Sequence, residues 1–106
     1  MSNTIYRKNE FRYGKRNSPM GRHPVYISAE STDKYKVNVI THSDTFFGQP
    51  TKELIDNPDK RKNRISIPVV IDKSELQNHR LNNWKMSKQN TKIRKKLDKR
   101  YRVVIT

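Results

Sequence analysis

The sequence predicts a mostly β protein with one C-terminal helix, closed into a small barrel. Residues 25–29 and 35–39 alternate between apolar and polar side chains, and residues 65–71 do the same. Alternation with period two is typical of strands that bury one face. Residues 88–100 instead space their apolar positions as a helix does. A barrel is favoured because closure removes sheet edges that so small a domain cannot otherwise cover.

The first two strands are expected to form a hairpin, because a polar turn at 31–33 separates them. Pro68 falls within the third run and cannot donate to a β ladder, so this strand lies at an edge or carries a bulge there. Residues 101–106 are short and β-branched enough to form a fourth strand. The segment 43–64 is unusually long for a loop and is expected to be functional or to contain a short element, such as helical turns at 50–56.

Ser87 is the expected N-cap of a helix over about 88–100. Three apolar residues of this helix are spaced to face the core: Ile93, Leu97 and Tyr101. Trp84, just before the helix, is interpreted as a core residue rather than a platform for base stacking.

Residues 1–21 are expected to form a basic N-terminal arm ahead of a domain at 22–106. Three aromatic residues alternate with cations in this segment: Tyr6, Phe11 and Tyr13. They can stack on nucleic-acid bases while the cations hold phosphates, or they can dock the arm onto the core. The residues themselves leave both interpretations open.

Charge is concentrated at the two ends of the chain. The 106 residues carry 24 Lys and Arg against 10 Asp and Glu, a formal net charge of +14. Residues 1–22 carry +5 and residues 84–102 carry +8, whereas residues 23–83 carry +1. This distribution is typical of a folded module that contacts a polyanion through cationic ends, and nucleic acid is the expected partner.

Composition excludes several classes of protein. No apolar run approaches the ~20 residues of a membrane helix, and the N-terminal residues do not resemble a signal peptide, so we expect a soluble, cytoplasmic protein. The chain has no Cys, and its three His are 19 and 37 residues apart, so neither a disulfide, a metal site nor a cofactor is expected. The helix over 88–100 has too narrow an apolar face for a membrane surface.

The residues expected to contact nucleic acid come mainly from the two basic ends. Cations supply the charge that phosphates require, and Ser43 supplies a hydroxyl group. The basic residues are Arg7, Lys8, Arg12, Lys15, Arg16, Lys92, Arg94, Lys95, Lys96, Lys99 and Arg100.

Five polar residues are expected to meet at one end of the predicted hairpin. Arg22 and His23 enter the first strand, and Thr41, His42 and Ser43 leave the second. These residue types suit metal-independent RNA cleavage, because histidine transfers protons near pH 7, arginine stabilises developing charge and a hydroxyl group holds a phosphate oxygen. The same residues can also bind phosphate without cleaving it.

Two strand segments carry a recognisable pattern: Gly21-Arg22-His23-Pro24-Val25-Tyr26-Ile27 and Val37-Asn38-Val39-Ile40-Thr41-His42-Ser43. Ile71-Asp72-Lys73-Ser74-Glu75-Leu76 and the helix after Ser87 extend the pattern over about 21–100. Together these segments resemble the PemK/MazF-like toxin family. The resemblance implies an SH3-like barrel, usually a homodimer, that cleaves single-stranded RNA without metal and is neutralised by an antitoxin. It places the family's functional Arg at Arg22 and its Thr at Thr41. The chain departs from the pattern where His23 precedes Pro24 and His42 follows Thr41.

Two hypotheses follow. The first is a small basic RNA-binding protein that acts as a toxin-type endoribonuclease, with Arg22, His23, Thr41 and His42 as its catalytic candidates. The alternative is a non-enzymatic nucleic-acid-binding accessory protein of a phage or mobile element, supported by the charge alone. Both share the same electrostatics, so salt dependence does not separate them, whereas an assay for cleavage or a neighbouring antitoxin-like reading frame does.

Overall fold

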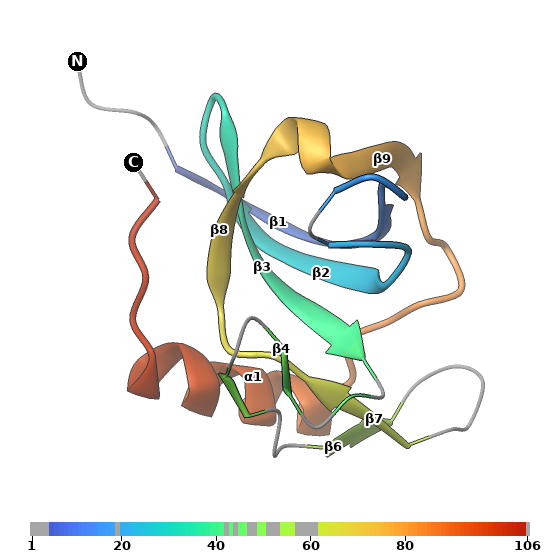
Figure 1. Ribbon diagram of the computed structural model, residues 1–106. Coiled ribbons are helices and arrows are strands. Elements are labelled where there is room, and N and C mark those ends of the chain that lie inside the picture. The colour runs from blue at the N-terminus through green and yellow to red at the C-terminus, as the bar shows by residue number, and fades with distance from the viewer. Residues whose placement is uncertain are drawn as a thin grey trace.

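The computed structural model describes residues 5–18, 20–41, 43, 45–46, 49–50, 54–56 and 62–105. Its strands are β1 (Tyr6–Gly14), β2 (Pro24–Glu30), β3 (Lys34–Thr41), β4 (Thr45–Phe46), β5 (Gln49–Pro50), β6 (Leu54–Asp56), β7 (Lys62–Ile65), β8 (Val69–Asp72) and β9 (Leu76–Arg80). The 3-10 turn η1 (Lys73–Glu75) and the helix α1 (Lys88–Arg100) complete the described elements. The predicted mostly β class with a C-terminal helix is confirmed (Figure 1).

Antiparallel pairing links seven of the strands into one main sheet, and β4 and β5 pair with each other in a separate two-stranded sheet. The order is β6-β7-β3-β2-β1-β9, and β8 pairs with β3 beside β7. The predicted hairpin is confirmed, because β2 and β3 pair with Val25 opposite Val39 and Glu30 opposite Tyr35. The pairing path β8-β3-β2-β1-β9 begins and ends on strands that are joined in the chain by η1 alone.

Residues 6–14 form a strand inside the sheet, which corrects the prediction of an N-terminal arm. β1 lies between β2 and β9, and Phe11 on it is buried. The sequence of β1 does not show a regular apolar–polar alternation, because the register shifts between Arg7 and Glu10, where Asn9 has a left-handed backbone conformation with φ of 54°. Such a bulge interrupts the alternation on which strand prediction depends. The loop that follows is also part of the fold, since Met20 is fully buried.

The third predicted run is divided into β7 and β8 at residues 66–68. Ser66 stabilises this break, because its Oγ accepts a hydrogen bond of 2.7 Å from the backbone N–H of Val39 and its own N–H donates to the Val39 carbonyl. Pro68 lies in this break, where the β ladder is interrupted. The strands on either side of it, β7 and β8, both pair with β3.

Two other predictions of secondary structure are wrong. Residues 54–56 form β6, paired with β7, and not a helical turn. Residues 101–105 do not form a fourth strand, because the chain leaves α1 in an irregular conformation. A strand that was not predicted, β9, pairs with β1 on the side away from β2 and carries one buried residue, Leu76. A strand that is mostly exposed and polar gives little alternation to detect.

The sheet separates two hydrophobic cores. The first lies on one face and contains Met20, Val25, Ile27, Tyr35, Val37, Val39, Ile71 and Leu76. The second lies between the opposite face and α1 and contains Phe11, Tyr26, Ile40, Ile65 and Leu97, with Leu81, Trp84, Met86, Ile93 and Tyr101 packed against it. Successive residues of β2 alternate between the cores, because side chains along a strand point to opposite faces.

The predicted helix and its cap are confirmed. Ser87 is the N-cap of α1, and its side chain accepts a hydrogen bond of 3.0 Å from the backbone N–H of Asn90. Ile93, Leu97 and Tyr101 face the second core, as their spacing predicted. Figure 1 shows α1 lying across the sheet face, followed by a tail that runs toward the N-terminal end of the chain.

Candidate nucleic-acid interface

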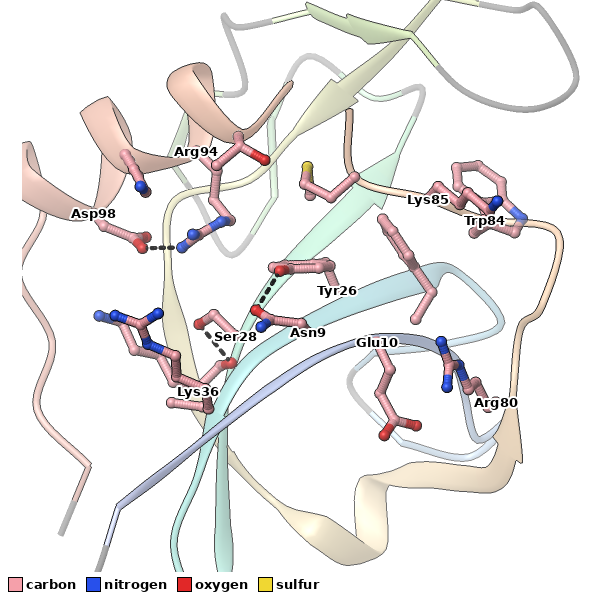
Figure 2. Close-up of a pocket in the computed structure, with 16 residues that line it drawn as sticks. Asn9, Glu10, Tyr26, Ser28, Lys36, Arg80, Trp84, Lys85, Arg94 and Asp98 are labelled. Atoms are coloured by element: carbon pink, nitrogen blue, oxygen red, sulfur yellow. Dashed lines mark hydrogen bonds and ion pairs between the residues drawn. The ribbon is translucent and has the colours of Figure 1, made fainter. Parts of the chain in front are cut away.

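A groove of about 730 Å³ runs between α1 and the adjacent face of β1, β2 and β3. This volume is within the range of about 300–1,000 Å³ of pockets that hold drug-sized ligands. Six of its lining residues are cationic and two are acidic: Arg7, Lys36, Arg80, Lys85, Arg94 and Lys95, against Glu10 and Asp98. We call this site the helix–sheet groove. Figure 2 shows that its side chains converge from the strands, from the segment before α1 and from α1 itself.

The aromatic floor of the groove belongs to the second core. The ring centroids of Phe11 and Tyr26 lie 5.0 Å apart, and those of Phe11 and Trp84 lie 5.5 Å apart, both in tilted geometry. Phe11 and Tyr26 are buried, whereas Trp84 is partly exposed. A short turn places Trp84 here: Leu81 donates its N–H to the Phe11 carbonyl over 2.8 Å, and Trp84 donates to the Leu81 carbonyl over 3.4 Å.

An ion pair from α1 closes one side of the groove. The Arg94 guanidinium lies 5.3 Å from the centroid of the Tyr26 ring and donates a hydrogen bond of 2.5 Å to Asp98. Arg94 Nε and Asp98 Oδ1 are buried without a hydrogen-bond partner among the described residues. Such atoms carry a desolvation penalty. The pair therefore has unused hydrogen-bonding capacity in this conformation.

The bulge in β1 shapes the opposite wall. Asn9 accepts a hydrogen bond of 2.8 Å from the Tyr26 hydroxyl group, so the bulged residue is fixed to β2. Burial raises the pKa of the Tyr26 phenol, against the opposing effect of the Arg94 charge. Tyr26 therefore stays protonated and acts as a hydrogen-bond donor at neutral pH.

The solvent-facing side of α1 carries a continuous row of cations, which we call the helix stripe. Its members are exposed: Lys88, Lys92, Lys95, Lys96, Lys99 and Arg100. With a rise of 1.5 Å per residue, the row from Lys88 to Lys99 is about 16 Å long. Lys95 also lines the helix–sheet groove, so the two cationic surfaces are continuous.

The structure separates the cations that the sequence grouped together in the N-terminal segment. Lys8 lies 3.3 Å from Glu10 and 3.5 Å from Glu30, and Arg12 donates to Glu10 over 2.8 Å. These two are part of an ion-pair network on the sheet. Arg7 is exposed and lines the groove, whereas Lys15 and Arg16 are exposed in the loop after β1.

The four catalytic candidates lie at a different place from the groove. Continuing the β2–β3 register beyond Val25 and Val39 brings Arg22 and His23 to the same end of the hairpin as Thr41. Arg22 is exposed and His23 is half-buried, and neither lines the groove. His42 lies outside the described residues.

Close backbone packing fixes the segment that carries Arg22 and His23. Gly14 donates its N–H to the His23 carbonyl over 3.1 Å. A Cβ atom on Gly14 would collide with the Gly21 carbonyl oxygen and would lie 2.7 Å from Met20 Cβ. Gly21 has φ of 59°, a conformation that favours glycine. The turn that leads into β2 therefore leaves no room for a side chain at Gly14 and favours glycine at Gly21.

Thr41 is buried, and its Oγ1 accepts a hydrogen bond of 3.1 Å from the Ser43 N–H. In this conformation its hydroxyl group supports the local backbone and presents little surface to a ligand. Ser43 is exposed. Arg64 pairs with Thr41 across β3 and β7, so it is a second arginine at this sheet end that the sequence interpretation missed.

Several groove residues were also missed. Lys36 and Arg80 lie in the segment of nearly balanced charge, and Lys85 lies just before the predicted helix. Only the fold brings these three residues together. Among the described residues, no cluster of three or more His, Cys, Asp or Glu is placed to hold a metal ion. The described part of the chain contains no helix long and apolar enough to cross a membrane.

Comparisons with protein-family models, with curated proteins and with solved structures return no match.

Proposed function

We propose that this protein binds nucleic acid through the cationic surface formed by the helix stripe and the helix–sheet groove. The observation that carries the proposal is the division of α1 into two faces. Its apolar residues are packed into the second core, and its other face exposes six cations. Counterion release from a polyanion is the interaction that such a surface favours.

The packing of α1 argues against an anionic membrane as the partner. A helix that lies on a membrane buries its own apolar face among the lipids. In this protein that face contacts the sheet through Leu97 and Ile93, so it is already occupied. The resemblance to RNA-cleaving toxins makes RNA the nucleic acid to test first. The pairing path β8-β3-β2-β1-β9 supports the SH3-like barrel that this resemblance implies.

Binding is tested by fluorescence anisotropy with a labelled, unstructured RNA oligonucleotide over a range of salt concentrations. Lys96→Gln/Lys99→Gln should lower the affinity and reduce the slope of log affinity against log salt by about 1.4, since each contact with a single strand contributes about 0.7. Lys15→Gln/Arg16→Gln removes the same charge from the loop after β1, outside α1 and the groove lining, and is expected to have a smaller effect. Equal losses in both variants would mean that net charge, and not this surface, determines binding.

Metal-independent RNA cleavage is the second candidate function. The β2–β3 register supports it, because it brings the backbone around Arg22 and His23 to the same sheet end as Thr41. The test is incubation of the protein with the same RNA in EDTA. Arg22→Ala should abolish cleavage, and Arg16→Ala, another exposed arginine of the preceding loop, should retain it. Intact RNA with the wild-type protein would exclude this function and leave the binding proposal standing.

A further inference from the structure

The helix–sheet groove combines two features that a surface for phosphates alone does not need. Its floor is aromatic, and its cations lie on both sides of that floor. Arg80 and Lys85 accompany Trp84 at one end, and Arg94 lies toward the other end, as Figure 2 shows. Single-stranded nucleic acids are recognised by this combination, with bases stacked on aromatic rings and the backbone held by cations.

We infer that the groove receives an unpaired nucleotide, with its base against Trp84 and its flanking phosphates near Lys85 and Arg94. This inference rests on the proposed function and names the form of nucleic acid that the groove selects. Phe11 and Tyr26 cannot serve as the platform, because both are buried. Trp84 lines the groove and is partly exposed, so part of its ring is available to a base.

The position of the platform selects against a double helix. Trp84 lies in a groove between a helix and a sheet, whereas the bases of a duplex are stacked inside it. A duplex can therefore place its phosphates on the helix stripe but cannot bring a base to Trp84 without unpairing it. The helix stripe therefore binds phosphates of either form of nucleic acid, whereas the helix–sheet groove requires an accessible base.

Trp84 is the only tryptophan of the chain, so its intrinsic fluorescence reports on the groove directly. The full chain is titrated with an unlabelled single-stranded RNA octamer and with a stable blunt-ended RNA duplex that has no unpaired base, and total binding is followed in parallel by anisotropy with labelled copies of both RNAs. The octamer should quench Trp84 emission at saturation. The duplex should bind with little quenching.

Substitution provides the second test. Trp84→Leu should weaken octamer binding by about 5- to 150-fold, the range for removal of one stacked base, and Trp84→Phe should recover most of that loss. Tyr13→Leu removes an exposed aromatic residue outside the groove and should leave the affinity unchanged. Circular dichroism shows whether each variant is folded, and the quenching experiment needs no variant.

The outcomes separate this inference from the proposed function. If the octamer binds by anisotropy but neither Trp84 emission nor the Trp84→Leu affinity changes, the groove assignment is wrong and nucleic-acid binding stands. If neither RNA binds, both fail. If a polyglutamate peptide quenches Trp84 and the octamer does not, the groove binds an acidic protein segment, which also overturns the inference.

Discussion

The hydroxyl group of Tyr26 on β2 donates a hydrogen bond to Asn9 Oδ1 on β1 across 2.8 Å. The bond holds a left-handed residue at a bulge, and this residue forms one wall of the helix–sheet groove. One side-chain contact therefore connects the irregularity of β1 to the shape of the candidate site.

Removal of this contact should lower the free energy of unfolding. Tyr26→Phe loses one hydrogen bond and should cost about 0.5–1.5 kcal/mol. Asn9→Gly loses the same bond but tolerates the backbone conformation, whereas Asn9→Ala should cost a further ~1–2 kcal/mol for a left-handed residue with a Cβ atom. Urea denaturation of the three variants checks this order, and equal stability of Asn9→Ala and Asn9→Gly would contradict it.

If the groove binds phosphate as proposed, Asp98 should compete with it, because the Asp98 carboxylate already accepts a hydrogen bond from the Arg94 guanidinium and both residues line the groove. Asp98→Asn should therefore raise affinity for single-stranded RNA by roughly threefold to tenfold, equivalent to ~0.7–1.4 kcal/mol. Asp33→Asn makes the same change in net charge in the β2–β3 turn and is the matched control. An equal gain in both variants, measured by anisotropy at one salt concentration, would attribute the effect to net charge.

Gly14→Ala should destabilise the fold and displace the turn that carries Arg22. The added Cβ would meet the Gly21 carbonyl oxygen and Met20 Cβ, and overpacking of this kind costs about 1–3 kcal/mol. Gly21→Asn is the milder comparison, since asparagine tolerates a left-handed conformation. Thermal unfolding distinguishes the two, and a Gly14→Ala protein of wild-type stability would show that the turn adjusts freely.

Stability should fall in acid partly through Glu30. Burial alone would raise the pKa of Glu30, but the hydrogen bond from Lys73 and the charge of Lys8 outweigh it and lower the pKa below the ordinary 4.5. A carboxylate with a lowered folded pKa stabilises the protein above pH 4.5, and this contribution is lost as the pH falls through the folded value. Glu30→Gln should flatten the dependence of unfolding free energy on pH below about 4.5. A curve parallel to wild type would assign the acid sensitivity to other groups.

Local periodicity was sufficient to predict the β2–β3 hairpin and α1, because both elements place regular apolar positions against a core. It was insufficient for β1, where Asn9 breaks the alternation, and for β9, whose residues after Leu76 contact solvent more than core. Side-chain hydrogen bonding at Ser66 divides a run that looked continuous.

The groove was beyond sequence reasoning for a different reason. Its walls come from β1, β2, β3, the segment around Trp84 and α1, which meet only through tertiary packing. The sequence grouped the cations of α1 together as candidate contacts for nucleic acid. The sequence of α1 did not indicate that the Arg94 side chain lies over the Tyr26 ring and donates a hydrogen bond to Asp98.

The division of the molecule into two cores has a consequence for the order in which the nascent chain becomes compact. The first core is complete once β9 has been synthesised, since all its members lie at or before Leu76. The second core lacks its cover until residues 81–101, which follow in the chain, have also docked. During that interval Phe11, Tyr26, Ile40 and Ile65 form an uncovered apolar face. We expect this face to be the point at which a newly made chain is most prone to aggregate or to be captured by a chaperone.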